Sequence, residues 1–176
     1  VMEFIEGDNL QQMLEKQRRR GEWLSLADTL RVTSAVARAL DHAHRHKILH
    51  RDIKPANIMM RLDTEGSGTL QPVLTDLGLA KLGREGIEPR QTNMTMGTPD
   101  YMSPEQALGE ATDLRSDVYS LGVLLYELAV GQRPFSFKSI TAATRFYAAL
   151  ERTAPAPSAV RPDLPPALDK VIVRAM

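Results

Sequence analysis

The 176-residue sequence predicts an α+β fold that is mainly helical and contains one small β-hairpin. Apolar residues recur at helical spacing from position 26 to about 45, and a second run, 116–128, is apolar around most of its circumference. Two short apolar segments, 58–60 and 73–75, flank a polar, glycine-containing stretch at 63–68, which is typical of two strands joined by a hairpin. A chain of this length with 43% apolar residues can bury one core, so we expect a single domain.

The first predicted helix begins after Ser25, because Ser25 and Asp28 have the spacing of a capping pair at a helix N-terminus. Its apolar stripe is formed by positions 26, 30, 36, 40 and 43, and the helix ends near Arg45. The basic cluster at 16–20 contains no aromatic residue, so we interpret it as a solvated helix end.

Two further helices are predicted from the residues at their ends. Ser103 can cap a helix, Pro104 suits its first position, and Gln106 can complete a capping box. The run 116–128 indicates a helix that is buried on nearly every side and ends before Gly131. Residues 153–166 contain five prolines, which predicts an irregular surface segment before a final helix from about Pro166.

The composition limits the partners and the compartment. Lysine plus arginine and aspartate plus glutamate both number 22, so no overall charge favours nucleic acid or an anionic membrane. The chain has no cysteine, which suits a reducing compartment, and it has no signal peptide and no apolar run that could span a bilayer. We therefore expect a cytoplasmic segment without membrane contact. A membrane anchor elsewhere in the protein is compatible with this expectation.

The octet at 50–57, which reads HRDIKPAN, carries the strongest chemical signal. It places the carboxylate of Asp52, the amine of Lys54 and the carboxamide of Asn57 between a helix and a strand. Phosphoryl transfer needs an acceptor for a hydroxyl proton, a cation beside the migrating group and an oxygen ligand for Mg²⁺. The alternative interpretation of the octet is a polar turn between two elements.

Two other carboxylates have positions that call for an explanation. Asp76 follows the apolar segment 73–75 and precedes a leucine and Gly78, so it can turn towards a metal-bound nucleotide, although an ordinary turn has the same pattern. Asp117 lies on the apolar helix 116–128, where a charge is costly unless it is hydrogen-bonded. We therefore expect Asp117 to have donors nearby and a structural role.

Together these segments resemble the protein kinase family. The octet is similar to the catalytic loop, and Asp76-Leu77-Gly78 is similar to the magnesium-binding motif, with Leu77 in place of phenylalanine. Residues 97–106, GTPDYMSPEQ, resemble the end of the activation segment, where a protein substrate docks. Lys54 and Thr98 resemble the serine/threonine branch, and the runs PAN, SPEQ and SDVYSLG resemble its eukaryotic-like members in bacteria.

The resemblance implies a role for each residue of the site. Asp52 would orient the substrate hydroxyl and accept its proton, and Lys54 would steady the γ-phosphate of ATP. Asn57 and Asp76 would hold Mg²⁺, with Mn²⁺ as an alternative ion. The first residues, VMEFIEG, resemble the hinge between the two lobes. The groups expected to contact adenine are the carbonyl of Glu3, the amide of Ile5, Met2 as gatekeeper and Met59 as floor.

The resemblance also implies supporting and regulatory residues. His50 would pack on Leu77, Asp117 would hold the backbone of the catalytic loop, and Arg51 would pair with a phosphate on the activation loop. Thr92 is the expected phosphosite and Thr95 the second, because both lie shortly before Gly97 in a segment without regular patterning. Glu105 would be a buried carboxylate whose arginine partner lies beyond Met176.

The family's glycine-rich loop, its strand lysine and its helix glutamate, all part of the small lobe, have no counterpart in the sequence. We therefore expect residues 1–176 to be the hinge and most of the large lobe of a kinase domain cut at both ends, with the hairpin at the catalytic cleft. The expected function is a protein serine/threonine kinase that uses ATP, with this segment inactive alone. A pseudokinase or scaffold and a small-molecule kinase are the alternatives.

Overall fold

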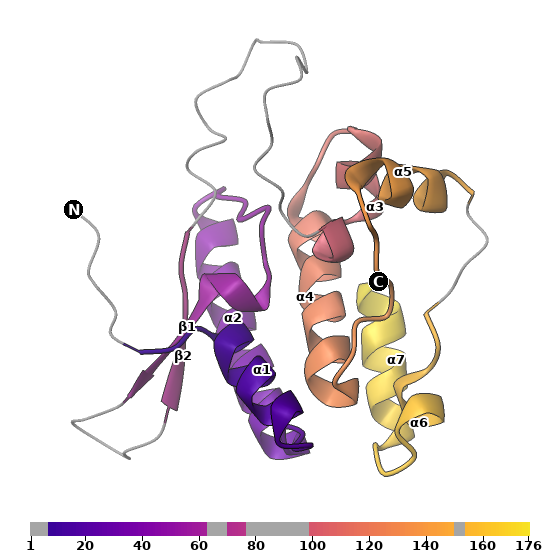
Figure 1. Cartoon of the computed structure of the whole chain (residues 1–176). Helices are drawn as coiled ribbons and strands as arrows, with labels where there is room; N and C mark the ends of the chain where they lie inside the picture. The colour runs from indigo at the N-terminus through magenta and orange to yellow at the C-terminus, as the bar shows by residue number, and fades with distance from the viewer. Residues whose placement is uncertain (1–6, 63–69, 77–98, 150–153) are drawn as a thin grey trace.

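The computed structural model describes residues 7–62, 70–76, 99–149 and 154–176, and its helices pack on both sides of one central helix (Figure 1). The central helix, α4 (Leu114–Val130), contacts α2 (Leu26–Arg45) on one side and α7 (Pro166–Ala175) on the other. The other helices are α1 (Leu10–Arg19), α3 (Pro104–Leu108), α5 (Ile140–Ala148) and α6 (Pro157–Val160), with 3₁₀ turns η1 (Pro55–Asn57) and η3 (Pro99–Tyr101).

The prediction that α4 is buried on nearly every side is confirmed, because α4 contributes to all three apolar clusters of the described chain. Leu124 and Leu128 pack with α1, α2 and the hairpin, whereas Tyr126 packs against α7. Val123 packs with α3 and α5. Such a helix has little freedom to shift, so the positions of the side chains that project from it are well fixed.

Helix α2 has the predicted bounds, but its buried stripe differs at one position. The hydroxyl of Ser25 accepts a hydrogen bond from the backbone N–H of Asp28 at 3.0 Å, as the capping pattern predicts. Leu30, which we assigned to the apolar stripe, is 44% exposed. Thr29 and Val32 are buried instead, because the stripe continues with helical periodicity from positions 43, 40 and 36.

The predicted hairpin is present as an antiparallel pair, β1 (Ile58–Leu62) and β2 (Leu70–Leu74), with Ile58 opposite Leu74. Thr75, which we assigned to the second strand, lies just beyond it, and the predicted turn at 63–68 lies outside the described residues. The other edge of β1 is bonded to the chain before α1, because the N–H of Met60 donates to the carbonyl of Asp8 at 3.0 Å.

The remaining element predictions are mostly confirmed. Ser103 and Gln106 form a reciprocal capping box at the start of α3, and α7 begins at Pro166. The described part of the predicted irregular segment, 154–166, is less irregular than predicted, because it contains the short helix α6 with Pro157 at its first position. The sequence analysis did not predict α5. Within the described residues, no helix combines the length and the apolarity that crossing a membrane requires.

Gly131 ends α4 in a left-handed conformation, with φ of 81°, and Trp23 lies directly against it. A Cβ atom at this position would lie 1.9 Å from Cζ3 of Trp23. Gly21 has a similar φ of 68°, but no atom lies within 4 Å of the corresponding position. The two glycines therefore separate the cost of the backbone conformation from the cost of a steric clash.

We expect Gly131→Ala to destabilise the fold more than Gly21→Ala. The Gly21→Ala variant should lose about 1–2 kcal/mol, the cost of a left-handed residue. The Gly131→Ala variant should lose roughly 1–3 kcal/mol more, because the indole must move away from the new methyl group. Urea unfolding of both variants measures the difference, and equal losses would contradict the close contact with Trp23.

Candidate active site

The octet 50–57 connects α2 to β1 and is anchored by its apolar members. Ile53 and Pro55 are buried, whereas the side chain of Asp52 is 47% exposed. Pro55 also opens the η1 turn, where its restricted φ favours the 3₁₀ conformation. The alternation of buried and exposed residues therefore presents the carboxylate of Asp52 at the surface of a rigid turn.

The structure brings the three polar residues of the octet together. The amine of Lys54 lies 2.8 and 3.0 Å from the two carboxylate oxygens of Asp52. Nδ2 of Asn57 donates to the carbonyl of Asp52 at 2.7 Å and to its Oδ2 at 3.0 Å. Because Asn57 uses its amide nitrogen for both bonds, its Oδ1 is left as an acceptor for another partner.

Asp76 lies at the end of β2, beside the residue that bonds to Asn57. The N–H and the hydroxyl of Thr75 both donate to the carbonyl of Asn57, at 2.9 and 3.1 Å. Asp76 itself is exposed and has a left-handed φ of 57°. Within the described part of the chain, its side chain makes no hydrogen bond to Asp52, Lys54 or Asn57, so its link to the octet runs through the backbone of Thr75.

The available oxygen donors fit a magnesium ion that is bound together with a phosphorylated ligand. The described residues contain no group of three or more histidine, cysteine, aspartate or glutamate side chains that could hold a metal alone. Oδ1 of Asn57 and the carboxylate of Asp76 are hard oxygen ligands, and Mg²⁺ is commonly held by one or two protein carboxylates plus phosphate oxygens and water. These two residues therefore suit a shared site better than a closed protein cage.

His50 is completely buried and connects the catalytic turn to the residue that follows β2. Its Nε2 lies 3.0 Å from the carbonyl of Thr75, and its Nδ1 lies 3.3 Å from the N–H of Asp52. A carbonyl only accepts, so Nε2 carries the hydrogen and Nδ1 is the acceptor. His50 thus ties the backbone of Asp52 to the residue before Asp76. Leu77, on which we expected His50 to pack, lies outside the described residues.

Asp117 of α4 has the donors that its burial requires. Its Oδ2 accepts from the N–H of His50 at 2.9 Å, and its Oδ1 accepts from the N–H of Arg51 at 2.8 Å. On the other side of Arg51, the side chain of Gln106 donates to the Arg51 carbonyl at 2.9 Å. Both peptide groups that flank Arg51 are therefore held, which explains how it keeps a left-handed φ of 63°.

One nitrogen of the Arg51 guanidinium lacks a partner among the described residues. Its Nε is buried and has no hydrogen-bond acceptor within that part of the chain. Arg51 also lines a cavity of about 500 Å³ with Met102 and Gln106. A buried, unpaired guanidinium nitrogen is costly, so this position favours an anionic ligand.

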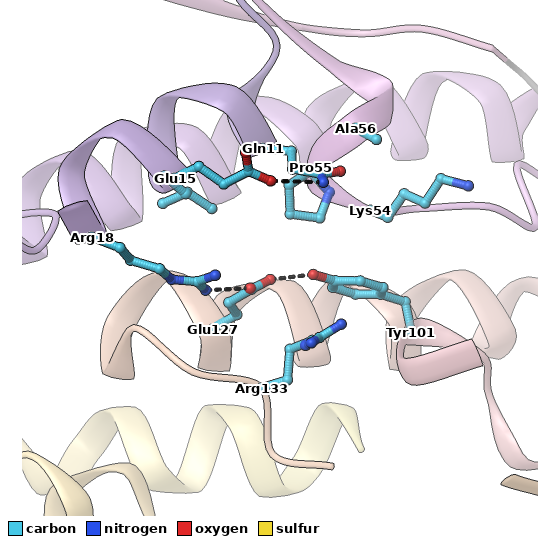
Figure 2. Close-up of a pocket in the computed structure, with 10 residues that line it drawn as sticks. Gln11, Glu15, Arg18, Lys54, Pro55, Ala56, Tyr101, Glu127 and Arg133 are labelled. Carbon is cyan, nitrogen blue, oxygen red and sulfur yellow. Dashed lines mark hydrogen bonds and ion pairs between the residues drawn. The ribbon is translucent and has the colours of Figure 1, made fainter. Parts of the chain in front are cut away.

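A second buried acid, Glu127 of α4, was missed by the sequence analysis. Figure 2 shows it between Arg18 of α1, whose guanidinium lies 2.6 Å from Oε1, and the hydroxyl of Tyr101, which donates to Oε2. Arg18 belongs to the basic cluster that we interpreted as a solvated helix end; it is exposed in the last turn of α1, as predicted, and it also pairs with Glu127. The signal was available, because Glu127 is a charge on the same apolar helix as Asp117.

The residues around Glu127 line a cavity of about 340 Å³ that opens beside Lys54 (Figure 2). Burial and the neighbouring carboxylate of Glu127 raise the pKa of the Tyr101 phenol, so it remains a donor at physiological pH. The charges at this cavity are largely paired within the protein, since Arg133 contacts Asp100. The walls of the cavity are therefore held in place by contacts between α1, α4 and η3.

Glu105 differs from the expectation of a buried carboxylate. It is half-buried, and the hydroxyl of Ser116 donates to its Oε1 at 2.5 Å. No cation pairs with it among the described residues, and it lines a cavity of about 390 Å³ with Tyr119, Ala175 and Met176. The carboxylate is thus partly solvated, which lowers the cost of leaving it without an ion-pair partner.

The remaining predicted positions are only partly described. Met59 lies on β1, is half-buried and forms an isolated bridge with Asn9, which follows the segment that resembles the hinge. The other predicted residues lie outside the described residues, namely Met2, Glu3, Ile5, Thr92, Thr95 and Thr98.

We expect Asp117→Asn to lower the free energy of unfolding by roughly 3 kcal/mol, because the new amide would face a backbone N–H and leave a buried donor unpaired. Asp113→Asn is the matched control, since Asp113 caps the same helix from an exposed position and asparagine caps equally well. Urea unfolding of both variants measures the difference. Equal stability of the two variants would contradict the role that we assign to the Asp117 carboxylate.

Several proteins named serine/threonine-protein kinases are similar to this chain over its whole length. Serine/threonine-protein kinase PksC of Streptomyces coelicolor is 40% identical over 176 residues, which is 100% of this chain and 30% of the relative. Serine/threonine-protein kinase Pkn1 of Myxococcus xanthus is 38% identical, and serine/threonine-protein kinase PknB of Mycolicibacterium smegmatis is 36% identical, each again over 100% of this chain. The chain covers 24% of the Myxococcus protein and 26% of the Mycolicibacterium protein.

The family comparison covers almost the whole sequence. Residues 1–170 match the model of the protein kinase domain. The match includes the octet 50–57, the hairpin and α4, which are the elements that form the site described above. This chain belongs to the protein kinase domain family.

Proposed function

We propose that the protein containing this chain transfers the γ-phosphoryl group of ATP to serine or threonine hydroxyls of protein substrates. The observation that carries the proposal is the convergence of Asp52, Lys54 and Asn57 on one rigid turn, with bonds of 2.7 to 3.0 Å. The serine/threonine class is supported by Lys54 and by relatives named serine/threonine-protein kinases. ATP with a divalent ion supplies the phosphoryl group and neutralises part of its charge.

Asp52 is the residue to which we assign the substrate hydroxyl. Its carboxylate is exposed, so a hydroxyl can approach it, whereas its backbone is held by His50 and Asn57. In the transfer, the carboxylate orients the hydroxyl and takes its proton as the oxygen attacks the γ-phosphorus, while the bond from that phosphorus to the β,γ-bridging oxygen breaks and ADP leaves. Lys54, whose side chain is 18% exposed, places a cation beside the developing negative charge.

Asn57 and Asp76 are the proposed metal ligands, because each has a side-chain oxygen that accepts no hydrogen bond from the residues the structure describes, and the two lie on adjacent elements. Binding of adenine by Glu3, Ile5 and Met59 is proposed on the match to the family's hinge. We also propose that Arg51 binds a phosphate on the activation segment, at Thr92 or Thr95, which would supply the anion that its unpaired Nε favours.

The chain represents only part of such an enzyme in our proposal. We assign residues 1–176 to the hinge and most of the large lobe of a kinase domain. This segment contains no glycine-rich loop to cover the phosphates of ATP, so we expect no transfer by residues 1–176 alone. A pseudokinase that binds nucleotide without transferring phosphate is the competing function, and the first experiment below separates the two.

Asp52→Ala in the full-length protein should lower kcat by roughly 10²-fold or more, because the hydroxyl loses both its orientation and its proton acceptor. Asp41→Ala is the matched control, since Asp41 is an exposed aspartate on α2 that pairs with Arg45 across one helical turn. Transfer of radiolabelled phosphate from ATP to casein-like substrates and to the protein itself measures kcat. Wild-type activity in the Asp52 variant would refute the assignment of the base, and an inactive wild-type protein would favour the pseudokinase.

Asp76→Asn should raise the Mg²⁺ concentration for half-maximal activity by about tenfold, because the metal loses a charged oxygen ligand. Asp41→Asn serves as the control for a carboxylate removed from a distant, exposed position. A magnesium titration at saturating ATP measures the shift. An unchanged magnesium requirement in the Asp76 variant would remove Asp76 from the metal site.

A further inference from the structure

We propose that His42 and His46 form a chelating site for one divalent transition-metal ion, such as Zn²⁺, at the C-terminal end of α2. Both residues are exposed, and the centroids of their rings lie 4.6 Å apart. Side chains four residues apart lie on one face of a helix, which is the spacing that lets two histidines bind the same metal ion. The pair shares no residue with the magnesium site proposed above.

His42 and His46 are the two of the chain's four histidines whose rings are accessible to solvent and to a ligand. His44 is largely buried, and its Nε2 lies 2.8 Å from Oδ2 of Asp117. His50 is buried and uses both ring nitrogens in the contacts described above. The ring nitrogens of His42, in contrast, make no hydrogen bond to any residue that the structure describes.

The end of α2 determines the tautomer of His46. His46 caps the helix, and its backbone N–H bonds to the carbonyl of Ala43 at 3.0 Å rather than to the carbonyl of His42. The imidazole takes that place, since its Nδ1 lies 2.8 Å from the His42 carbonyl and must carry the hydrogen. In the neutral ring, Nε2 is then left with its lone pair. Metal-binding histidines usually donate their other ring N–H in this way.

The electrostatics of the helix end also favour a cation. The last carbonyls of a helix carry a partial negative charge, and the proposed site lies in the last turn and the cap of α2. Nearby cations oppose binding weakly. Arg45 is paired with Asp41 at 2.7 Å, and Arg38 and Lys47 are at least partly exposed, so their charges act through water.

The type of ligand predicts the type of ion. Imidazole nitrogens suit Zn²⁺, Ni²⁺ and Cu²⁺, whereas Mg²⁺ takes oxygen ligands. The described residues contain no group of three or more histidine, cysteine, aspartate or glutamate side chains that could hold a metal, so water completes the coordination in our proposal. A bound ion joins residue 42 to residue 46, closes the last turn of α2 and stabilises the folded state by mass action.

The experiment measures how Zn²⁺ protects each histidine of the full-length protein from carbethoxylation by diethyl pyrocarbonate, with mass spectrometry to locate the modified residue. Zn²⁺ should slow the modification of His42 and His46 with one common midpoint, whereas His44 serves as the internal reference and should not respond. In His42→Asn, the Zn²⁺ concentration that half-protects His46 should rise roughly 10- to 100-fold, because a single nitrogen forms no chelate. Mg²⁺ at millimolar concentration should protect neither residue.

A second variant tests the spacing. Combining Asp41→His with His42→Asn keeps four histidines but places the exposed pair five residues apart, on different faces of the helix. This variant should lose protection of His46 as His42→Asn does. Asp41→Asn alone is the matched control for the lost carboxylate, and it should shift the midpoint less than about threefold, because an exposed charge contributes little through water.

Each outcome decides the proposal without reference to phosphoryl transfer. Absence of protection in the wild-type protein, or the same midpoint in His42→Asn, would overturn it. A wild-type midpoint in the five-residue spacing variant would show that His46 binds the ion without a partner at position 42, which also overturns the chelate. If His42→Asn does not fold, the reciprocal variant His46→Asn decides, with protection measured at His42.

Discussion

The geometry of the site depends on the hydrogen bonds that the carboxylate of Asp117 accepts. It lies on α4, the helix that contributes to all three apolar clusters of the described chain, and bonds two successive backbone N–H groups of the octet. A buried charge is stable only when its hydrogen-bonding capacity is used, and here the catalytic turn itself supplies the donors. The stability of the core and the shape of the site are therefore coupled through one side chain.

The same helix anchors the neighbouring cavity through Glu127, which connects α4 to α1 by Arg18 and to η3 by Tyr101. Two acids on one buried helix thus fix the positions of two surfaces, namely the catalytic turn and the walls of the cavity beside Lys54. Both acids use partners from other elements, so their cost of burial is offset only in the folded chain. This arrangement explains why an otherwise apolar helix retains charged residues.

Backbone strain is concentrated where the proposed chemistry takes place. Of the three described non-glycine residues with positive φ, Arg51 and Asp76 belong to the site, and Lys47 lies just before the octet. Arg51 is held by Asp117 and Gln106, and the residue before Asp76 is held by His50 and Asn57. Such conformations cost energy, and they persist because more than one surrounding hydrogen bond holds each of them in place.

The sequence alone indicated that Asp52, Lys54 and Asn57 lie together between a helix and a strand. It also predicted the hairpin, the bounds of α2 and the start of α7, because these depend on local periodicity, capping residues and proline positions. It also indicated that Asp117 needed donors, but it did not identify them all. His44 lies 73 residues from Asp117, and Arg18 lies 109 residues from Glu127. Contacts at such separations depend on how α1, α2 and α4 pack, which no local pattern encodes. The exposure of Leu30 and the partial solvation of Glu105 were likewise settled by packing, since burial is a property of the assembled layers and not of a residue's own sequence neighbourhood.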